Sequence, residues 1–232
     1  MKLLTLRRVE MSSIPQPNTV LLLIDIQEGL KHPSYWGHSP SNPSFERNAK
    51  LLIATYRSLI SSAGFTSLPP PHKIIHIQHA STNPGSPLSP SSPGFLFQNW
   101  AAPRDGELVI EKRVHSAFIG TKLEEVLRNH FGGNPGRLWI TGLALDQSVT
   151  STVRMAENLG VCDGADGRKG VVSLIEDATV AWEKDDGVKA DIVHKVHVTS
   201  LRDFATIDKA EEVLNLWQEW IGRQKISHVL YQ

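Results

Sequence analysis

The sequence predicts a three-layer α/β protein: a doubly wound, mostly parallel sheet with helices on both faces. Two observations predict this class. Short apolar runs rich in β-branched residues recur along the chain, and segments with apolar residues at helical spacing separate them. Alternating strands and helices favour parallel pairing, and ligands then bind beyond the carboxyl ends of the strands. The 232 residues fit one domain, expected at 19–232 after a flexible leader at 1–18.

The first half of the chain supplies two expected strands, one helix and a long loop. Residues 19–26, TVLLLIDI, are continuously apolar, which is typical of a central strand buried on both faces. Residues 43–63 carry apolar side chains at helical spacing, and residues 73–78, KIIHIQ, predict the second strand. The Pro-, Ser- and Gly-rich segment 81–95 is long enough to predict a functional loop over the site.

The second half continues the alternation and ends in a tryptophan-containing helix. We expect strands at 107–111, 137–141 and 170–175, and helices at 121–131, 148–159, 186–204 and 210–223. In the last helix Leu214, Trp217 and Ile221 share one face, which suits either a contact between subunits or packing within the chain.

Composition limits the partners. Lysine plus arginine equals aspartate plus glutamate at 24 each, so the chain has no excess positive charge to attract nucleic acid or an anionic membrane. No apolar run approaches the roughly 18–20 residues of a membrane span. The first residues lack a convincing apolar core and cleavage site of a secretory signal peptide, which leaves a flexible leader or, as the alternative, a mitochondrial presequence. The single cysteine, Cys162, excludes an intramolecular disulfide and a Cys-rich zinc site. We therefore expect a cytoplasmic protein with a small-molecule partner.

Three polar residues follow or end predicted strands, where this architecture gathers its chemistry. They are Asp25, Lys112 and Ser148. Each has an ordinary explanation on its own: Asp25 as a helix cap, Lys112 as a solvated surface residue, and Ser148 as an N-cap or first-turn residue. Their sequence contexts favour a shared site.

These contexts resemble one family. LLLIDIQ, EKRVHSAFIGTKLEEVL and ITGLALDQSVTSTVRMAENLG, in this order, resemble the isochorismatase-like cysteine hydrolases, which include nicotinamidases, N-carbamoylsarcosine amidases, and biuret and ureidoacrylate hydrolases. IEDATVAW and VHKVHVTSLRDFATI extend the resemblance, which covers roughly residues 19–210. It implies a homo-oligomer and a catalytic triad of Asp, Lys and Cys at positions 25, 112 and 148.

The resemblance also implies how such a site works. The carboxylate takes the proton of the thiol, the ammonium stabilises the thiolate, and the thiolate attacks a carbonyl carbon. The resulting oxyanion is held by backbone N–H groups, which map onto Ala144 and Ser148, with a cis peptide bond between Leu143 and Ala144. The helix that begins near Ser148 adds positive potential at that point.

Ser148 departs from the family pattern, and three explanations stay open. The serine is an engineered substitution in an amidohydrolase; or the protein uses a reaction without a nucleophile, as in isochorismatases whose Asp protonates a vinyl ether; or the protein is a binding relative or a weak serine hydrolase. An alcohol is far harder to ionise than a thiol, and serine nucleophiles normally rely on a histidine or a neutral lysine. Cys162 lies beyond the helix and should be remote from the site.

A metal site is not expected. Nicotinamidases of this superfamily bind a divalent metal through an Asp-x-His pair after the second strand and a further His, but here the strand reads IIHIQHAST. His76 and His79 are three residues apart, so on a strand they point to opposite faces. We therefore predict no metal and no cofactor, with His76 packed inside and His79 lining the site.

The remaining predicted cleft residues come from the loops. Alongside His79, the residues expected to contact the substrate are Gln27, Trp36, Phe97, Trp100 and Phe118. Ser116, in the segment HSAF, is expected to fix the local loop. Together these features predict hydrolysis of a C–N bond in a small amide or ureide. Hydrolysis of an isochorismate-like vinyl ether and ligand binding without catalysis are the alternatives.

Overall fold

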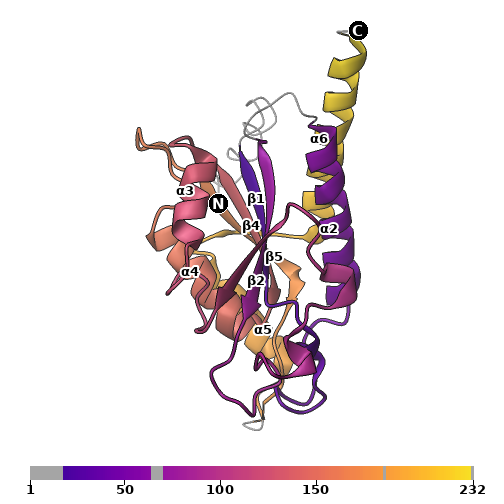
Figure 1. Ribbon diagram of the computed structural model, residues 1–232, viewed down its shortest axis with the longest axis vertical. Coiled ribbons are helices and arrows are strands. Elements are labelled where there is room, and N and C mark those ends of the chain that lie inside the picture. The colour runs from indigo at the N-terminus through magenta and orange to yellow at the C-terminus, as the bar shows by residue number, and fades with distance from the viewer. Residues whose placement is uncertain (1–17, 64–69, 185–186, 231–232) are drawn as a thin grey trace.

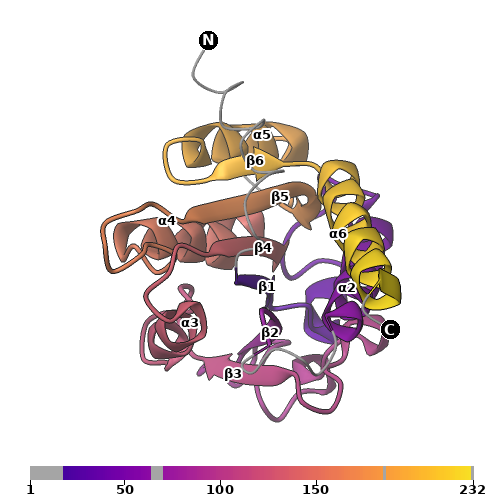
Figure 2. The same cartoon turned by 90° about the horizontal axis from the view of Figure 1, so that it is seen from above.

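A computed structural model describes residues 18–63, 70–184 and 187–230, so the predicted leader lies outside the described residues except for Asn18. Six strands form one sheet in the order β3-β2-β1-β4-β5-β6, and every pair is parallel; Figure 1 shows the sheet between its helices, and Figure 2 labels the strands in this order. The strands are β1 Thr19–Ile24, β2 His72–His79, β3 Leu108–Lys112, β4 Arg137–Leu143, β5 Val171–Val180 and β6 Thr206–Asp208. This confirms the predicted α/β class, with an all-parallel sheet.

Helices cover both faces of the sheet (Figure 2). One face packs against α2 Phe45–Ser62 and α6 Ala210–Leu230, and the other against α3 Leu123–Phe131, α4 Thr150–Asn158 and α5 Ala190–Leu201. Short helices occupy the connections at the carboxyl edge: η1 Glu28–Lys31, η2 Pro93–Phe95, η3 Asn99–Ala101 and η4 Leu145–Val149.

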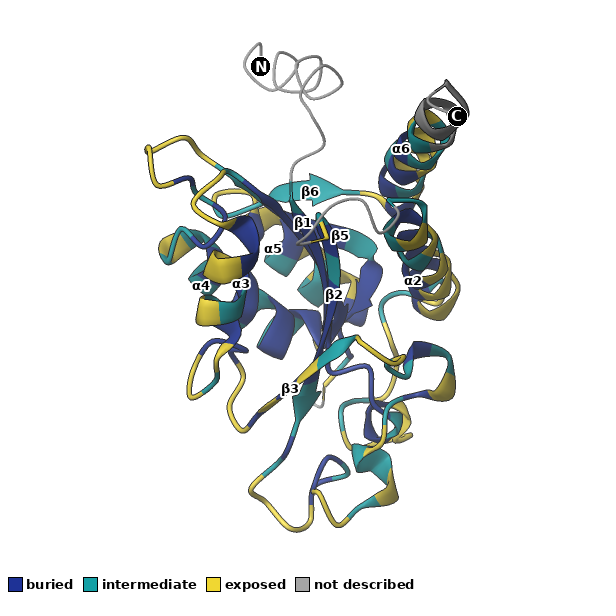
Figure 3. Cartoon of the chain, turned by 45° about the horizontal axis from the view of Figure 1, so that its top comes forward, coloured by how far each residue is buried: buried dark blue, intermediate teal, exposed yellow. Residues whose placement is uncertain are grey.

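The central strand β1 supplies side chains to two separate hydrophobic cores. Leu22 and Ile24 belong to the core beneath α3, α4 and α5, whereas Leu21 and Leu23 belong to the core beneath α2 and α6. All four are buried, and the strands form a buried layer between helices with exposed outer faces (Figure 3). Successive side chains of a strand point to opposite faces, so a strand covered on both sides must be apolar throughout.

The tryptophans of α6 pack within the chain. Trp217 lies edge-on against Trp139 of β4 and Tyr56 of α2, with ring centroids 5.1 and 4.7 Å apart. Trp220 stacks on His72 at the start of β2, and both tryptophans of α6 are buried. Aromatic pairs in these geometries contribute about 0.5–1.5 kcal/mol beyond area burial, so this cluster fixes α6 against the sheet.

Several predicted boundaries were wrong. The helix expected at 148–159 begins earlier, with the π-helical turn η4 at 145–149, and the helix expected at 186–204 spans only 190–201. The strand expected at 170–175 continues to Val180, because a register irregularity lets its second half pair with Gly142 and Leu143. The three-residue strand β6 was not predicted, since three half-buried residues carry no readable periodicity.

Candidate active site

Lys112 ends β3 and is the centre of the site. Its side chain is buried, and Nζ donates to Asp25 Oδ2 at 2.7 Å, to Ser148 Oγ at 3.0 Å and to His79 Nδ1 at 3.0 Å. A lysine ammonium has three N–H donors and no acceptor. The three neighbours therefore match its full hydrogen-bonding capacity.

The strand order explains why these residues meet. β2 lies between β3 and β1, and its last residue, His79, is in register with Lys112. The lysine side chain is long enough to contact His79 and also to reach Asp25, which follows β1. The site thus forms where three neighbouring strands end at the carboxyl edge, as expected for a parallel sheet.

Asp25 directly follows β1 and has an unusual backbone conformation. Its φ of 50° makes it the one non-glycine residue with positive φ among those described, and such residues commonly belong to functional sites. Immediately beside it, Gly142 of β4 approaches Ile24 so closely that a Cβ there would lie 2.1 Å from the Ile24 carbonyl oxygen. The glycine therefore lets β4 pack against the end of β1 where the carboxylate is presented.

The two carboxylate oxygens of Asp25 differ in their hydrogen bonding. Oδ2 accepts from Lys112, whereas Oδ1 is buried and has no hydrogen-bond partner within the described part of the chain. Burying a carboxylate oxygen without a partner is unfavourable. Such an atom is suited to accept a hydrogen bond or a proton from a bound substrate.

Ser148 lies in the π-helical turn that follows β4. The peptide bond between Leu143 and Ala144 is cis, as the family resemblance predicted, and η4 starts one residue later. The carbonyl of Ala144 accepts hydrogen bonds from the N–H groups of Gln147 and Val149. This turn brings the Ser148 hydroxyl to Lys112, at the start of the helical segment that continues as α4.

His79 is held as a neutral hydrogen-bond acceptor. Burial and the charge of Lys112 lower its pKa, against a smaller opposing effect of Asp25. The Lys112 ammonium can only donate, so Nδ1 is the accepting nitrogen and the proton of the neutral ring is on Nε2. At neutral pH the imidazole is therefore uncharged.

The side chain of Gln27 hydrogen-bonds to the end of β2 and to the loop 81–95. Its Nε2 donates to the carbonyls of His79 at 3.1 Å and Phe95 at 2.8 Å, and its Oε1 accepts from the His79 backbone N–H at 2.8 Å. The residue is fully buried, and both amide protons are used. Gln27 consequently positions the end of β2 and the loop 81–95.

The loop 81–95 packs tightly against η1. A Cβ on Gly94 would lie 2.3 Å from the Pro87 carbonyl oxygen and 2.7 Å from the Gly29 Cα, so only glycines fit at this contact. Within the loop, the Ser81 N–H donates to the Leu88 carbonyl. The long polar segment is thus an ordered part of the carboxyl edge.

The predicted aromatic residues contribute packing around the site. The indole of Trp36 donates to the Gly29 carbonyl, and that of Trp100 donates to Gln98. Trp100 lies against Phe45 and Lys50 of α2. The Phe97 backbone bridges to Gln27 while its ring lies 5.7 Å from His76, and Phe118 is buried in the core beneath α3 and α4. None of these contacts involves Lys112, and their contacts with a substrate stay predictions.

The other reactive side chains lie outside the site. His76 Nε2 pairs with Glu107 at 2.9 Å, so it packs away from His79 as expected from their spacing. Ser116 Oγ accepts from the Phe118 N–H, which fixes the local loop. Cys162 is buried, and burial raises the pKa of its thiol, so it cannot replace a nucleophile at position 148.

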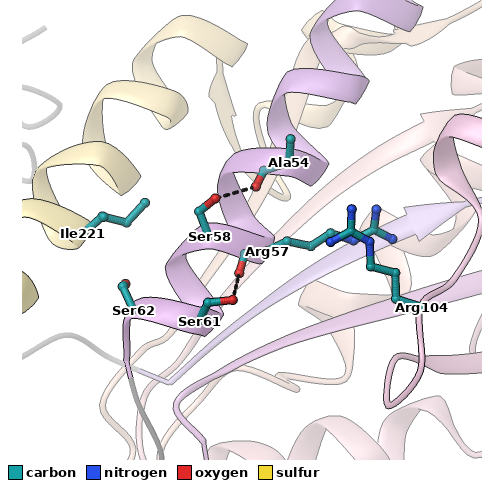
Figure 4. A pocket seen from close by; sticks show the side chains of 7 residues that line it. All are labelled: Ala54, Arg57, Ser58, Ser61, Ser62, Arg104 and Ile221. Atoms are coloured by element: carbon teal, nitrogen blue, oxygen red, sulfur yellow. Dashed lines mark hydrogen bonds between the residues drawn. The ribbon is translucent and has the colours of Figure 1, made fainter.

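A separate cavity of about 570 Å³ lies between α2 and α6 (Figure 4). Its lining residues are Ala54, Arg57, Ser58, Ser61, Ser62, Arg104 and Ile221. The hydroxyls of Ser58 and Ser61 donate to carbonyls of their own helix, and Arg57 is paired with Glu107. The cavity therefore lacks a nucleophile next to a base, and contains none of the predicted site residues.

Residues 18–63, 70–184 and 187–230 were searched for a metal-binding group of side chains and for a membrane-spanning helix. Within them, no three His, Cys, Asp or Glu side chains are grouped so as to hold a metal ion. No helix there has the length and apolar character needed to cross a membrane.

Sequence reasoning missed the contact between His79 and Lys112. It placed His79 among substrate contacts, but the imidazole is a direct partner of the lysine. The available signal was positional: both residues end adjacent strands, so an in-register pairing brings them together.

Known proteins resemble this chain in sequence and fold. Residues 19–202 match the isochorismatase domain. The uncharacterized isochorismatase family protein YrdC of Bacillus subtilis (strain 168) is 32% identical over 200 residues, which cover 84% of this chain and 94% of that protein. The crystal structure of a candidate hydrolase of the isochorismatase family from Chromobacterium violaceum is 32% identical, with a TM-score of 0.71, and the match covers 89% of this chain and 96% of that one.

A cysteine hydrolase from Pseudomonas syringae pv. phaseolicola shares the fold at 17% identity, with a TM-score of 0.70 over 90% of this chain and 99% of that one. The parallel α/β fold is thus shared with a class of hydrolases. The chain belongs to the isochorismatase family of hydrolases.

Proposed function

We propose that this protein hydrolyses the C–N bond of a small amide or ureide by acyl transfer to the side chain at position 148. The observation that carries the proposal is the pair of contacts made by Lys112, to Asp25 at 2.7 Å and to Ser148 at 3.0 Å. An ammonium beside the nucleophile stabilises its anionic form, and a nearby carboxylate serves as base and then as acid.

Each residue of the proposed site has a role. Where the side chain at position 148 is a thiol, Asp25 takes its proton and returns it to the leaving amine, with Oδ1 as the oxygen that receives the proton. The backbone N–H groups of Ala144 and Ser148 form the oxyanion hole. The helical segment that begins after Ala144 supports this assignment, because amides at the start of a helix favour negative charge.

The proposed substrate is small. Ser148 is 5% exposed, Asp25 2% and Lys112 1%, so the reacting atoms lie below the molecular surface. A compact planar amide or ureide fits such a site better than a peptide or a polymer. In this proposal Gln27, Phe97 and Trp100 shape the surroundings, and His79 adjoins the lysine.

The test compares the chain with three variants on a panel of amides, ureides and isochorismate. Ser148→Cys should raise C–N hydrolysis at least about 100-fold, because a thiol ionises near neutral pH and an alcohol does not. Asp25→Asn in that background should abolish the gain. Ser151→Cys is the matched control, since it places a thiol one turn away, where Ser151 Oγ donates to the Gln147 carbonyl. Inertness of Ser148→Cys across the panel would refute the proposal.

One observation favours a second reaction. The buried Oδ1 of Asp25 could hold a proton for transfer to the carbon of a vinyl ether, and that reaction requires no nucleophile at position 148. In this case the Ser148 chain itself cleaves isochorismate, Ser148→Cys changes little, and Asp25→Asn is inactive. A chain that only binds ligands would turn over nothing in either form.

A further inference from the structure

A serine at position 148 needs a stronger base than a carboxylate, and the structure contains one. Besides Asp25 and Ser148, the third atom that accepts from Lys112 is Nδ1 of His79, at 3.0 Å. Ser148 Oγ, Lys112 Nζ and His79 Nδ1 therefore form a continuous hydrogen-bonded chain with two links of 3.0 Å. Such a chain can carry a proton from the hydroxyl to the imidazole.

We propose that His79 is a relay residue that makes Ser148 a competent nucleophile by accepting a proton through Lys112. This inference rests on the proposed acyl-transfer function. His79 does not touch the reacting carbonyl in this scheme and acts only through the lysine.

The proton movements balance. Nζ of Lys112 gives one proton to Nδ1 of His79 and becomes a neutral amine, which is an established base for serine. The amine takes the Ser148 hydroxyl proton as Oγ forms a bond to the carbonyl carbon, and the carbonyl π electrons move to oxygen. When the tetrahedral intermediate collapses, the C–N bond breaks, and Lys112 protonates the departing nitrogen. His79 then returns its proton to the lysine.

The charges around His79 permit this transfer. Three titratable groups face it: Lys112 at the end of β3, Asp25 after β1, and His115 in the loop after β3. Burial and the positive charge of Lys112 both lower the pKa of the imidazole, but the second effect is removed during the transfer, because that charge leaves the lysine as it arrives on the histidine. The Lys112–His79 pair carries one positive charge before and after transfer, and the carboxylate of Asp25 favours it in both positions.

The backbone holds the relay in one geometry. The contact with the donor-only ammonium of Lys112 requires that Nδ1 of His79 carries no proton. The amide of Gln27 hydrogen-bonds both the N–H and the carbonyl of His79. A residue that only filled space would not need a fixed tautomer.

A fluorophosphonate probe tests the relay without knowledge of the substrate, because it phosphonylates activated serines. Mass spectrometry of the Ser148 peptide should detect labelling in the unaltered chain. His79→Asn keeps an acceptor for Lys112 but cannot take a proton, so labelling should slow by about 100-fold or more. His76→Asn is the matched control: it makes the same change on the same strand, at a histidine that pairs with Glu107, and should label at the original rate.

The pH profile separates a relay from a structural role. Labelling of the unaltered chain should decline as the pH falls through the pKa of His79, which lies below its usual value of about 6.5. The labelling rate of His79→Asn should show no such decline at acidic pH. The inference would be overturned by equal labelling rates in the unaltered and His79→Asn chains. It would also be overturned if His79→Asn kept the same decline of labelling at acidic pH, or if Ser148 were never labelled.

The Ser148→Cys background keeps the two proposals apart. A thiol ionises without a strong base, so His79→Asn should cost at most about tenfold there, against about 100-fold or more in the serine chain. An active Ser148→Cys variant beside an unreactive serine would sustain acyl transfer and refute the relay. Equal losses in the two backgrounds would make His79 purely structural. Inactivity of both chains would remove the proposed function and the relay together.

Discussion

Lys112 and Asp25 form an ion pair of 2.7 Å although β3 and β1, whose ends they occupy, are not neighbours in the sheet. The lysine crosses the end of β2 to make this contact, and the two side chains are 0% and 3% exposed. Each charge is therefore compensated almost entirely by the other and by the groups around it. Removing one partner leaves the other charge buried and unpaired.

This arrangement predicts a large loss of stability in Lys112→Met. The substitution removes the ammonium but keeps a long apolar side chain, so Asp25 loses its counter-charge without a large cavity. We expect about 3–5 kcal/mol less free energy of unfolding in urea. The double variant Asp25→Asn with Lys112→Met should recover much of the loss. A single variant as stable as the original chain would contradict the burial of the pair.

Gly142→Ala should disturb the same region through the backbone. A methyl group there would lie 2.1 Å from the Ile24 carbonyl oxygen, at a residue whose φ is 126°. Overpacking of this kind costs typically 1–3 kcal/mol in addition to the backbone strain. Urea unfolding measures the effect.

Gly106→Ala is the matched control for Gly142→Ala. Gly106 also has positive φ, 86°, but no atom lies within 4 Å of its would-be Cβ. It should show only the conformational cost, about 1 kcal/mol. Equal losses in the two variants would mean that the close approach of β4 to β1 contributes nothing.

Buried His72 predicts that stability declines in acid. Burial lowers its pKa to about 4, with a smaller effect of His130. The unfolded chain binds a proton below about pH 6.5 and the native chain does not, so stability is fully present above that pH and is lost as the pH falls toward 4. The contribution is about 3 kcal/mol, measurable by urea unfolding at several pH values.

His72→Asn should flatten this pH dependence, whereas His32→Asn, at an exposed position, should leave it unchanged. The variant will also be less stable overall, because His72 hydrogen-bonds Thr19 and stacks on Trp220. The diagnostic quantity is therefore the slope between pH 6.5 and 4. An unchanged slope would assign the acid sensitivity to other groups.

Chelation should leave folding and activity unchanged. The residues described in the structure contain no group of three or more side chains suited to a metal, and His76 and His79 of β2 have different partners. Dialysis against EDTA followed by thermal unfolding and activity assays tests this. If either folding or activity were lost and then restored by zinc or iron, the protein would require a metal ion and the prediction would be wrong.

Elements that depend on a local residue pattern could be predicted from the sequence, whereas those set by distant parts of the chain could not. β1 could be predicted because burial on both faces demands an unbroken apolar run. Asp25, Lys112 and Ser148 could be grouped because each lies near the end of a predicted parallel strand and because their sequence contexts resemble one family. The start of η4 could not be predicted, since a single π-helical turn of five residues is too short to show an apolar period.

The direct contact of His79 with Lys112 also could not be predicted from the sequence. It depends on the register between two strands and on the rotamer of a buried lysine, both set by residues far apart in the chain. Local patterns carry no information on either. What could be anticipated was only that polar residues at adjacent strand ends would lie near one another.

The last prediction concerns the reactivity of a thiol at position 148. In the unaltered chain iodoacetamide should not modify the folded protein, because Cys162 is buried and burial raises the pKa of its thiol. Ser148→Cys should be alkylated rapidly at position 148, with a midpoint below the value of about 8.5 for an ordinary thiol. The cause is the ammonium of Lys112, which contacts the side chain at this position, together with the start of the helix.

Two variants isolate that cause. Ser151→Cys presents a thiol on the same helical segment without the lysine and should titrate near the ordinary value. Adding Lys112→Met to Ser148→Cys should raise the midpoint of alkylation by at least about one pH unit, because the thiolate then loses its counter-charge beside an uncompensated Asp25. Peptide mass spectrometry across pH 5–10 gives all the midpoints. If Ser148→Cys reacts like the Ser151→Cys control, Lys112 does not activate position 148, and the acyl-transfer proposal loses its electrostatic basis.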